Sequence, residues 1–222
     1  MDNPIILIPS YNEIRTIGGI VRELKAKSLS VCVVDDGSSD GTFEAAQDAG
    51  AFVIRHDKNQ GKGASLRDGF EHALKGAFTA VLIMDADGQH LVSDVDNFFK
   101  KMDMSGADIV IGNRMSDTSL MPVSRKLTNK FMSYLISKIC QRRIPDTQCG
   151  FKLIKRNVLE NIKLDSSNYE IESELLLKAA KKGFKIESVP VKTVYEDEKS
   201  SINPFTDTLR FIAFLIKTAV EA

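Results

Sequence analysis

Short apolar runs alternate with helix-patterned segments over the first half of the chain. Residues 5–8, 31–34 and 52–54 form apolar runs of strand length, and each is followed by apolar residues at helical spacing. Such alternation is typical of βαβ units, in which a helix returns the chain to a parallel neighbouring strand. The pattern therefore predicts an α/β fold with an open, mostly parallel central sheet flanked by helices.

The same alternation continues, less regularly, through the second half. We expect Pro190 to place its strand at a sheet edge, because proline cannot donate to a ladder of backbone hydrogen bonds. Gly50, Gly76, Gly106 and Gly183 follow helix-patterned segments, as left-handed C-terminal caps would. The remaining expected strands are 80–84, 109–111, 151–154 and 186–194, and the expected helices are 17–24, 42–48, 64–74, 92–104, 124–140, 171–182 and an amphipathic C-terminal helix over 205–222.

The charge balance excludes some classes of partner. The 222 residues include 30 basic and 30 acidic side chains, so no net field attracts nucleic acid, and any anion site must be local. Three cysteines without a paired short spacing predict free thiols rather than a disulfide framework or a zinc site. This length and composition fit one domain in a reducing, cytoplasmic setting.

Two carboxylates follow the apolar run that ends at Met84. Asp85 and Asp87 are one residue apart, and a strand that ends in such a turn can direct both into the crevice beyond its carboxyl end. Hard oxygen ligands suit Mg²⁺ or Mn²⁺, which take further ligands from water and a substrate diphosphate. The pair therefore predicts a metal-assisted nucleotide-diphosphate site; the alternative for an isolated acidic pair is a solvated turn.

Polar residues also follow the first two expected strands. Asp36 could accept an imino proton from a base such as uracil or guanine, and Tyr11 could pack on the ring. The alternative is that these segments only form turns and helix caps. In residues 59–63, Lys62 offers a cation between two glycines near a helix start, but the segment lacks the spacing of a Walker loop and is a weak signal by itself.

Six segments gain specificity from their order along the chain. They are PSYNE at 9–13, VDDGSSDGT at 34–42, NQGKG at 59–63, DADGQH at 85–90, GNR at 112–114 and DTQCGFK at 146–152. Together they resemble the family-2 glycosyltransferases, and within that family the dolichyl- and polyprenyl-phosphate mannose or glucose synthases. The resemblance covers the chain from Pro4 to about Lys199.

This resemblance implies a GT-A nucleotide-sugar-binding fold. It implies inverting, metal-dependent transfer of a hexose from a UDP- or GDP-sugar to a polyprenyl or dolichyl phosphate. We expect one glycosyltransferase domain over 1–222, with a nucleotide-sugar-binding half at 1–112, an acceptor-binding half at 113–204 and the C-terminal amphipathic helix at 205–222.

The resemblance also assigns roles to single residues. For Arg114, Arg125 and Lys199, a role as solvated surface residues stays open as the alternative. By this resemblance, the nucleoside would contact Pro9, Tyr11, Glu13 and Asp36, the ligands of Mg²⁺ or Mn²⁺ would be Asp85, Asp87 and Gln89, and the acceptor phosphate would contact Arg114, Arg125 and Lys199. To the nucleotide-binding residues we add Lys62 and Asp85, and we expect the catalytic residues to be Asp87, Arg114 and Asp146.

Charge sets the expected chemistry. Loss of a nucleoside diphosphate builds negative charge on the leaving oxygen, which a metal ion can stabilise. A lipid phosphate already carries an anionic oxygen, whereas an alcohol acceptor ordinarily needs a general base, for which Asp146 is the candidate. The alternative for Asp146 is structural: it orders its loop or orients an arginine. Weaker candidates have two explanations each. Glu170, Glu172 and Glu174 could take part in catalysis or only favour the helix dipole. His90 could contact the diphosphate or the acceptor, or only form a loop hydrogen bond.

A polyprenyl acceptor would require contact with a membrane. We expect no signal peptide and no membrane span, since the late apolar run 211–216 is too short to cross a bilayer. The enzyme would instead be peripheral at the cytoplasmic face, with 124–140 and 205–222 as interfacial helices, unless core packing or a homo-oligomer buries those faces. The rival functions are transfer to a soluble or polysaccharide hydroxyl and non-catalytic nucleotide-sugar binding.

Overall fold

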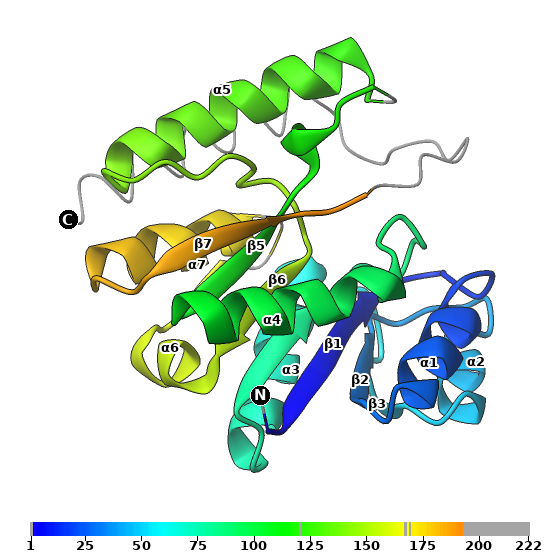
Figure 1. Ribbon diagram of the computed structural model, residues 1–222. Coiled ribbons are helices and arrows are strands. Elements are labelled where there is room, and N and C mark those ends of the chain that lie inside the picture. The colour runs from blue at the N-terminus through cyan, green and yellow to red at the C-terminus, as the bar shows by residue number, and fades with distance from the viewer. Residues whose placement is uncertain (1, 120, 167, 169, 193–222) are drawn as a thin grey trace.

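The structure of the protein is a computed structural model that describes residues 2–119, 121–166, 168 and 170–192 (Figure 1). These residues form a central sheet with helices on both faces. The strands are β1 (Pro4–Ser10), β2 (Ser30–Asp35), β3 (Phe52–Arg55), β4 (Ala80–Ile83), β5 (Ile109–Asn113), β6 (Lys152–Lys155) and β7 (Ile186–Pro190). The helices are α1 (Ile17–Ala26), α2 (Thr42–Asp48), α3 (Lys62–Lys75), α4 (Val95–Ser105), α5 (Val123–Ile139), α6 (Arg156–Asn161) and α7 (Glu170–Lys181), with 3₁₀ turns η1 (Val92–Asp94) and η2 (Arg114–Ser116).

The described strands form one seven-stranded sheet in the order β3-β2-β1-β4-β6-β5-β7. β1 pairs in parallel with β2 and β4, β2 with β3, and β5 with β7. Of these strands, only β6 runs antiparallel to its neighbours β4 and β5. The predicted open, mostly parallel sheet is therefore confirmed, and β7 with Pro190 lies at an edge as expected.

Helices cover both faces of this sheet, and the hydrophobic core lies between the layers. In Figure 1, α1 and α4 lie in front of the strands and α3 lies behind them; α2 packs on α1, and α6 and α7 pack on α3. Residues 5–10 of β1 are all buried, as expected for a strand covered on both sides. α1 shows the opposite pattern, one buried stripe at helical spacing: Ile17, Gly18, Ile20, Val21 and Leu24.

The direction of winding reverses at β1 and β4. From β1 the sheet grows outward through β2 to β3, and the chain then returns to the other side of β1 as β4. Loops that leave the carboxyl ends of two such strands separate and open a crevice, which is where open α/β sheets bind ligands. In this chain the two loops are 11–16 and 84–91, and the second contains the predicted acidic pair.

Three local predictions differ from the structure. Gly76 is not a left-handed cap: its φ is −86° and its ψ is 179°, because the chain extends there toward the next strand, whereas the other three glycines have positive φ. The strand predicted over 186–194 ends at Pro190, because its partner β5 ends at Asn113, the residue paired with Pro190; residues 193–194 lie outside the described residues. The helix predicted over 92–104 starts with a 3₁₀ turn, so α4 begins at Val95.

The sheet contains strands from both predicted halves. β6, from the second half, inserts between β4 and β5, so strands of both halves share one sheet. The helix predicted over 205–222 lies outside the described residues, and so does the end of the predicted acceptor half. Among the helices of the described residues, none combines the length and the hydropathy that a bilayer-spanning segment requires.

Candidate active site

Residues predicted from distant parts of the sequence meet at one edge of the sheet. The carboxyl ends of β1, β2, β4 and β5 lead to Tyr11, Asp36, Asp85 and Arg114. Because β6 runs the other way, its first residue, Lys152, lies at this same edge. The switch in winding thus brings the nucleotide-binding and acceptor-binding candidates together.

The loops after β1 and β2 are hydrogen-bonded to each other. The Asn12 backbone N–H donates to Ser38 Oγ at 2.9 Å, and the Ser39 N–H donates to Asn12 Oδ1 at 3.0 Å. The Glu13 N–H donates to Thr42 Oγ1 at 2.8 Å. Asn12 has a φ of 57°, a left-handed conformation that asparagine tolerates. These bonds fix the two loops as one platform.

The predicted nucleoside-binding residues have different surroundings on this platform. Pro9 is buried within β1, whereas 48% of Tyr11 is exposed. Glu13 is half-buried, and its carbonyl accepts the N–H groups of Thr16 and Ile17 at 3.2 and 3.1 Å. Tyr11 therefore offers an accessible ring beside the crevice, and Glu13 shapes the turn into α1.

Asp36 anchors the loop that precedes α3. Its carboxylate accepts the N–H groups of Gln60 and Gly61 at 2.9 and 2.8 Å, and His56 Nδ1 lies 2.6 Å from its Oδ1. Burial alone would lower the pKa of His56, but hydrogen bonds to Asp36 and Asp68 outweigh it and raise this pKa. The structure thus gives Asp36 a positioning role, and its contact with a nucleobase stays a prediction.

Lys62, the first residue of α3, is ion-paired with two carboxylates. Its Nζ lies 2.6 Å from Asp85 Oδ1 and 2.7 Å from Glu172 Oε1. Burial alone would lower the pKa of this ammonium group, but the charges of Asp85 and Glu172 raise it. In the same way, Lys62 lowers the pKa of Asp85 against the effect of burial. Both groups are therefore charged at neutral pH.

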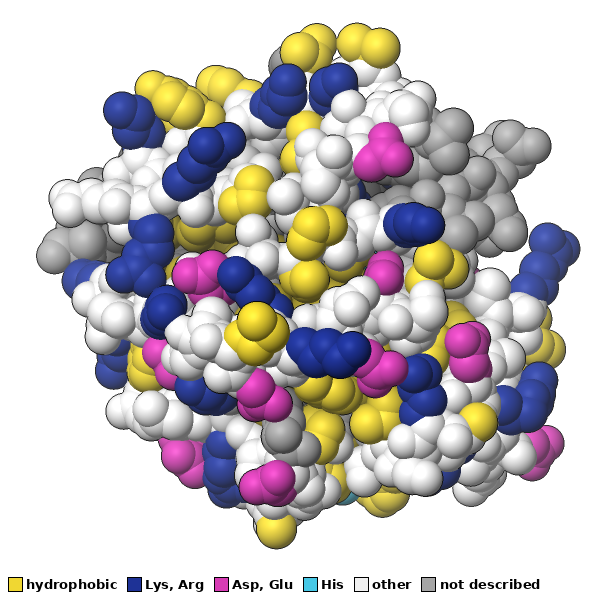
Figure 2. Space-filling view, in the orientation of Figure 1, with side chains coloured by type: hydrophobic (Ala, Val, Ile, Leu, Met, Phe, Trp, Pro, Cys, Tyr) yellow, Lys and Arg dark blue, Asp and Glu magenta, His cyan; other side chains and the backbone are white. Residues whose placement is uncertain are grey.

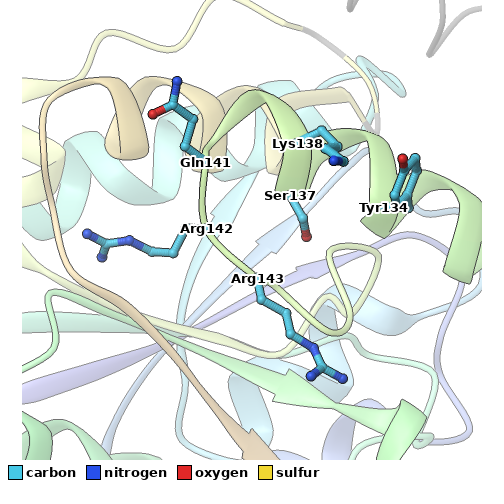
Figure 3. A pocket seen from close by; sticks show the side chains of 6 residues that line it. All are labelled: Tyr134, Ser137, Lys138, Gln141, Arg142 and Arg143. Carbon is cyan, nitrogen blue, oxygen red and sulfur yellow. The ribbon is translucent and has the colours of Figure 1, made fainter.

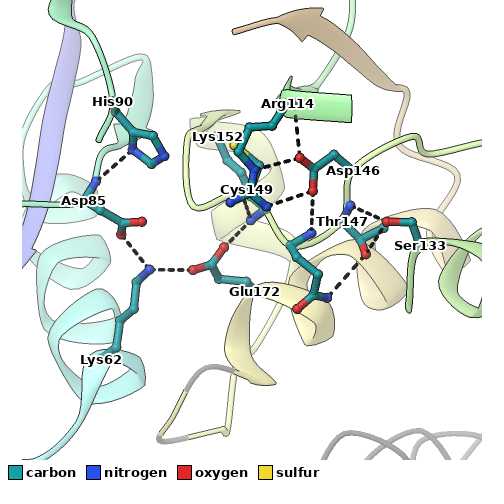
Figure 4. Close-up of polar contacts among 11 residues, drawn as sticks. Lys62, Asp85, His90, Arg114, Ser133, Asp146, Thr147, Cys149, Lys152 and Glu172 are labelled. Atoms are coloured by element: carbon teal, nitrogen blue, oxygen red, sulfur yellow. Dashed lines mark hydrogen bonds and ion pairs between the residues drawn. The ribbon is translucent and has the colours of Figure 1, made fainter. Parts of the chain in front are cut away.

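Glu172 extends this cluster to Lys152, which is fully buried in β6. The Lys152 ammonium donates to Glu172 Oε2 and to the carbonyl of Cys149. The charges of Lys152 and Lys62 lower the pKa of Glu172 although burial would raise it. The result is an ion-pair chain, Asp85–Lys62–Glu172–Lys152, that joins β4 and α3 to α7 and β6 (Figure 4).

Two glycines allow the loops to approach this closely. A Cβ atom on Gly150 would lie 2.3 Å from Asp85 Oδ2, and one on Gly112 would lie 2.9 Å from Cys149 Sγ. Neither position can accept a side chain without movement of its neighbours. The glycine in the 146–152 segment therefore lets the β6 loop lie directly against the Asp85 carboxylate.

Asp87 lies on the same loop as Asp85 and is half-buried. Its Oδ1 accepts the N–H of Gln89 at 2.9 Å. In the part of the chain that the structure describes, no three His, Cys, Asp or Glu side chains are grouped to hold a metal ion unaided. Sites for Mg²⁺ usually combine one or two carboxylates with substrate phosphates. The oxygens of Asp85, Asp87 and Gln89 therefore fit the predicted Mg²⁺ or Mn²⁺ if a diphosphate supplies further ligands.

His90 is buried at the end of this loop. Its Nδ1 accepts the backbone N–H of Asp85 at 3.2 Å, and its ring stacks on Phe151 with centroids 4.8 Å apart and planes 15° apart. Burial lowers the pKa of His90 to about 4, although the charge of Asp85 acts in the opposite direction. The imidazole is therefore neutral at pH 7.

Arg114 follows β5 and is held by Asp146. Its Nε lies 2.8 Å from Asp146 Oδ2 and its second terminal nitrogen 3.0 Å from Oδ1, while its backbone N–H donates to Oδ2 at 3.1 Å. Asp146 is fully buried and also accepts the N–H of Gln148. Such a bidentate pair fixes the plane of the guanidinium. The geometry matches the alternative in which Asp146 orients an arginine, and a direct catalytic role for Asp146 stays a prediction.

The other candidates lie in several places. Arg125 is half-buried near the start of α5, and Lys199 lies outside the described residues. Of the three acids at the start of α7, Glu172 belongs to the ion-pair chain. Glu174 instead accepts the backbone N–H groups of residues 165 and 166, and Glu170 is half-buried. The structure therefore separates three acids that the sequence could not rank.

The three cysteines are free thiols, as predicted. Burial raises the pKa of Cys32 to about 12 and the pKa values of Cys140 and Cys149 to about 11. Thiols with such pKa values are protonated at neutral pH, and the thiolate is the nucleophilic form. These residues are therefore packing groups rather than nucleophiles.

The sequence reasoning gave no role to Lys152 or His56. Lys152 stands in the otherwise apolar run 151–154, and a buried ammonium requires a partner charge, so this position carried a usable signal. His56 follows β3 outside any segment that was singled out, and its bonds to Asp36 and Asp68 depend on the tertiary fold. Only the structure could reveal its position.

Comparison with known proteins identifies the family. The family model described as glycosyl transferase family 2 matches residues 5–163. The chain belongs to this family. The predicted resemblance is therefore confirmed, and so is the prediction that the protein is an enzyme, a glycosyltransferase.

Two relatives and one solved structure show the extent of the similarity. The UDP-N-acetylglucosamine–dolichyl-phosphate N-acetylglucosaminyltransferase of Methanococcus voltae is 26% identical over 86% of this chain and 86% of that protein. The polyprenol monophosphomannose synthase of Mycolicibacterium smegmatis is 29% identical over 84% of this chain and 76% of that protein. Glucosyl-3-phosphoglycerate synthase from Mycobacterium tuberculosis, solved with Mn²⁺, UDP and phosphoglyceric acid, has a TM-score of 0.71 at 16% identity and covers 97% of this chain and 78% of its own. This structural likeness confirms the predicted GT-A fold.

We predict that replacements of Glu172 and Lys152 have strongly non-additive effects on the free energy of unfolding. Replacement Glu172→Gln leaves the Lys152 ammonium buried without its anion, and should lower the free energy of unfolding by about 3–5 kcal/mol. The double replacement Glu172→Gln with Lys152→Met removes both charges and should regain most of this loss. Urea denaturation of the two single variants and the double variant measures the coupling. Additive effects would contradict the buried ion pair.

Proposed function

We propose that this glycosyltransferase moves a hexose from a UDP- or GDP-sugar to a polyprenyl or dolichyl phosphate, with inversion at the anomeric carbon. The observation that carries the proposal is that the acidic pair and the oriented Arg114 lie at one sheet edge. Carboxylates suit a metal-bound diphosphate, and a guanidinium suits a phosphate acceptor. The relatives named for dolichyl phosphate and polyprenol support this class of acceptor.

The donor nucleotide would occupy the crevice between β1 and β4. Tyr11 would pack on the base, and Asp36 would accept its imino proton while it holds the loop before α3. Pro9 and Glu13 would support this platform. Lys62 would lie near the diphosphate, since it begins α3 and contacts Asp85 at 2.6 Å. Uracil and guanine both offer an imino N–H, so this arrangement accepts either base class.

Asp85, Asp87 and Gln89 would hold Mg²⁺ or Mn²⁺ beside the diphosphate. When bound, this ion would act as a Lewis acid that offsets the charge developing on the leaving group. The chain itself keeps the ligands ready: the charge of Lys62 keeps Asp85 ionised, and the Gln89 N–H orients Asp87. The solved synthase with Mn²⁺ and UDP supports a divalent ion without deciding between the two metals.

The state of Asp146 favours a phosphate acceptor over a hydroxyl acceptor. Hydroxyl acceptors ordinarily need a general base, and Asp146 was the candidate. In the structure both of its oxygens engage Arg114, at 2.8 and 3.0 Å, and it is fully buried. A lipid phosphate attacks with an oxygen that is already anionic. Arg114 would bind that phosphate, with Arg125 and Lys199 as further contacts.

The surface of α5 supports a position at an anionic membrane. Its exposed apolar side chains lie among basic ones, and Figure 2 shows both kinds together along the upper edge of the molecule, over α5. At the end of the helix, a hollow of about 420 Å³ is lined by Tyr134, Ser137, Lys138, Gln141, Arg142 and Arg143 (Figure 3). The exposed apolar residues of the helix are Val123, Leu127, Phe131, Tyr134 and Ile139.

This composition is that of an interfacial helix, in which apolar side chains enter the bilayer and lysines and arginines contact anionic headgroups. We therefore place the enzyme at the cytoplasmic face of the membrane. A polyprenyl chain would then remain in the bilayer while its phosphate reaches the sheet edge.

We predict that Asp87→Ala lowers the rate of sugar transfer about 100-fold or more, because the metal ion that holds the diphosphate loses one of its oxygen ligands. Transfer of radiolabelled sugar from UDP- and GDP-hexoses to polyprenyl phosphate measures this. Chelation of divalent ions should abolish the wild-type reaction, and Mg²⁺ or Mn²⁺ should restore it. Asp96→Ala on α4, where the acid pairs with the exposed Lys27, is the matched control and should stay active.

The same assay tests the acceptor and the stereochemistry. Lipid phosphates should accept the sugar, whereas sugars and polysaccharides should not, and the product should have the opposite anomeric configuration to the donor. Transfer to hydroxyl acceptors alone would contradict the lipid-phosphate assignment. Nucleotide-sugar binding without any turnover would support the non-catalytic alternative.

We predict that Arg114→Lys raises the KM for polyprenyl phosphate about tenfold, because a lysine cannot keep the bidentate contact that fixes the cation. The dissociation constant of UDP or GDP should not change. Asp146→Asn should also raise the KM for polyprenyl phosphate, since it releases Arg114 from its bidentate contact. If Asp146 were instead the general base, Asp146→Asn would lower kcat and leave this KM unchanged.

We predict that Leu127→Ser combined with Phe131→Ser reduces binding to phosphatidylglycerol vesicles several-fold, because it removes apolar contact from α5. Binding of the full chain should also fall as salt rises, owing to screening of the basic side chains. Met104→Ser is the control, since Met104 is 88% exposed but lies on α4. If the wild-type chain does not sediment with these vesicles, the membrane assignment is wrong.

A further inference from the structure

His90 combines burial, a fixed ring plane and a ring nitrogen that forms no hydrogen bond with a described residue. Its side chain is only 6% exposed, and the stack on Phe151 sets the plane of the imidazole. The Asp85 N–H reaches Nδ1 at 3.2 Å, which leaves Nε2 as the unengaged nitrogen among the described residues. Nε2 is not one of the fully buried polar atoms that lack a partner among the described residues, so a ligand at the sheet edge can reach it.

The hydrogen bond from Asp85 also fixes the tautomer. A backbone N–H can only donate, so Nδ1 must be the unprotonated nitrogen, and the neutral ring carries its proton on Nε2. In Figure 4 the second nitrogen of the ring faces the side of the site that holds Lys152 and Arg114. The ring thus presents a fixed N–H donor between the acidic pair and the predicted acceptor-binding residues.

The surrounding charges indicate what this donor would contact. Lys62, Arg114 and Lys152 lie around the same space, and each is paired with a carboxylate, so a phosphate bound there would compete with those acids for the three cations. Both substrates of the proposed reaction bring phosphate oxygens, which accept hydrogen bonds strongly. A neutral N–H adds such a bond without placing another cation among these three.

We propose that His90 is a catalytic residue that donates its Nε2–H to a phosphate oxygen of a reacting substrate. This inference rests on the proposed function. The oxygen belongs either to the diphosphate of the donor or to the phosphate of the lipid acceptor. The hydrogen bond from the Asp85 N–H links the His90 ring to the loop that contains the acidic pair. A movement of this loop would therefore also move Nε2.

Two replacements separate the two nitrogens of the ring. In His90→Asn, the side-chain oxygen can take the place of Nδ1 and accept the Asp85 N–H, but nothing replaces the Nε2–H. In His90→Gln, the amide extends to the position of Nε2 and can supply the donor. Both variants lose the stack on Phe151, so they are matched for that loss. Melting temperatures of both variants report any structural effect.

We expect His90→Asn to lower kcat/KM for transfer about 10- to 100-fold, the range for a lost hydrogen bond to a charged group. His90→Gln should recover most of this activity at a similar melting temperature. If the bond is to the donor, the dissociation constant of UDP or GDP with Mg²⁺ rises in the Asn variant. If the bond is to the acceptor, that constant is unchanged and the KM for polyprenyl phosphate rises.

Equal activity of wild type and His90→Asn would overturn the inference while the proposed function stands. Equal losses in both variants, with equal falls in melting temperature, would also overturn it, because the ring would then be only a packing group. Wild-type protein that transfers no sugar from any donor to any lipid phosphate would reject the proposed function, and the assignment of His90 with it.

Discussion

The ion-pair chain from Asp85 through Lys62 and Glu172 to Lys152 fixes the relation between the two sides of the site. It contains two cations and two anions, so each of these buried or half-buried charges is offset by a neighbour. A buried charge that loses its partner is far more costly than the pair itself is favourable. β6 and α7 therefore cannot shift against β4 without a large penalty. Arg114, held by the same β6 loop, is thereby set at a defined place relative to the acidic pair.

Close backbone packing makes this chain of charges geometrically possible. Gly150 leaves room for Asp85 where any side chain would collide with its carboxylate. On the other wall of the crevice, the Thr16 hydroxyl donates to the carbonyl of Ala86 at 2.5 Å, which ties the loop after β1 to the loop after β4. Gly88 in that loop has a φ of 77° and lies against Thr16. The loop predicted to bind the metal ion is thus held from both sides by contacts within the protein.

Local sequence patterns predicted most of the fold and part of the candidate site. Strand and helix positions follow from short-range periodicity, and Asp85, Asp87 and Asp36 follow from turns after apolar runs. The insertion of β6 between β4 and β5 does not, because strand pairing depends on contacts distant in sequence. For the same reason the sequence could not identify the partners of Lys62, or say which arginine Asp146 would orient. A charged side chain at a buried position signals that a partner exists, but its sequence does not say which residue that partner is.

The distribution of charge at this edge of the sheet affects how a donor diphosphate and an acceptor phosphate, both anions, could react there. Two unit charges 4 Å apart repel by about 1 kcal/mol in water but by about 4 kcal/mol near a protein surface, so a site that excludes water must supply compensating charge. A metal ion held by the carboxylates would supply positive charge at the sugar donor, and Arg114 would supply it at the acceptor phosphate. Among the described residues, Lys62, Lys152 and Arg114 are each paired with an acid, which offsets their charges at this edge. Substrate phosphates would then compete with those acids for the same cations, so binding both substrates can orient them without a permanent excess of buried positive charge.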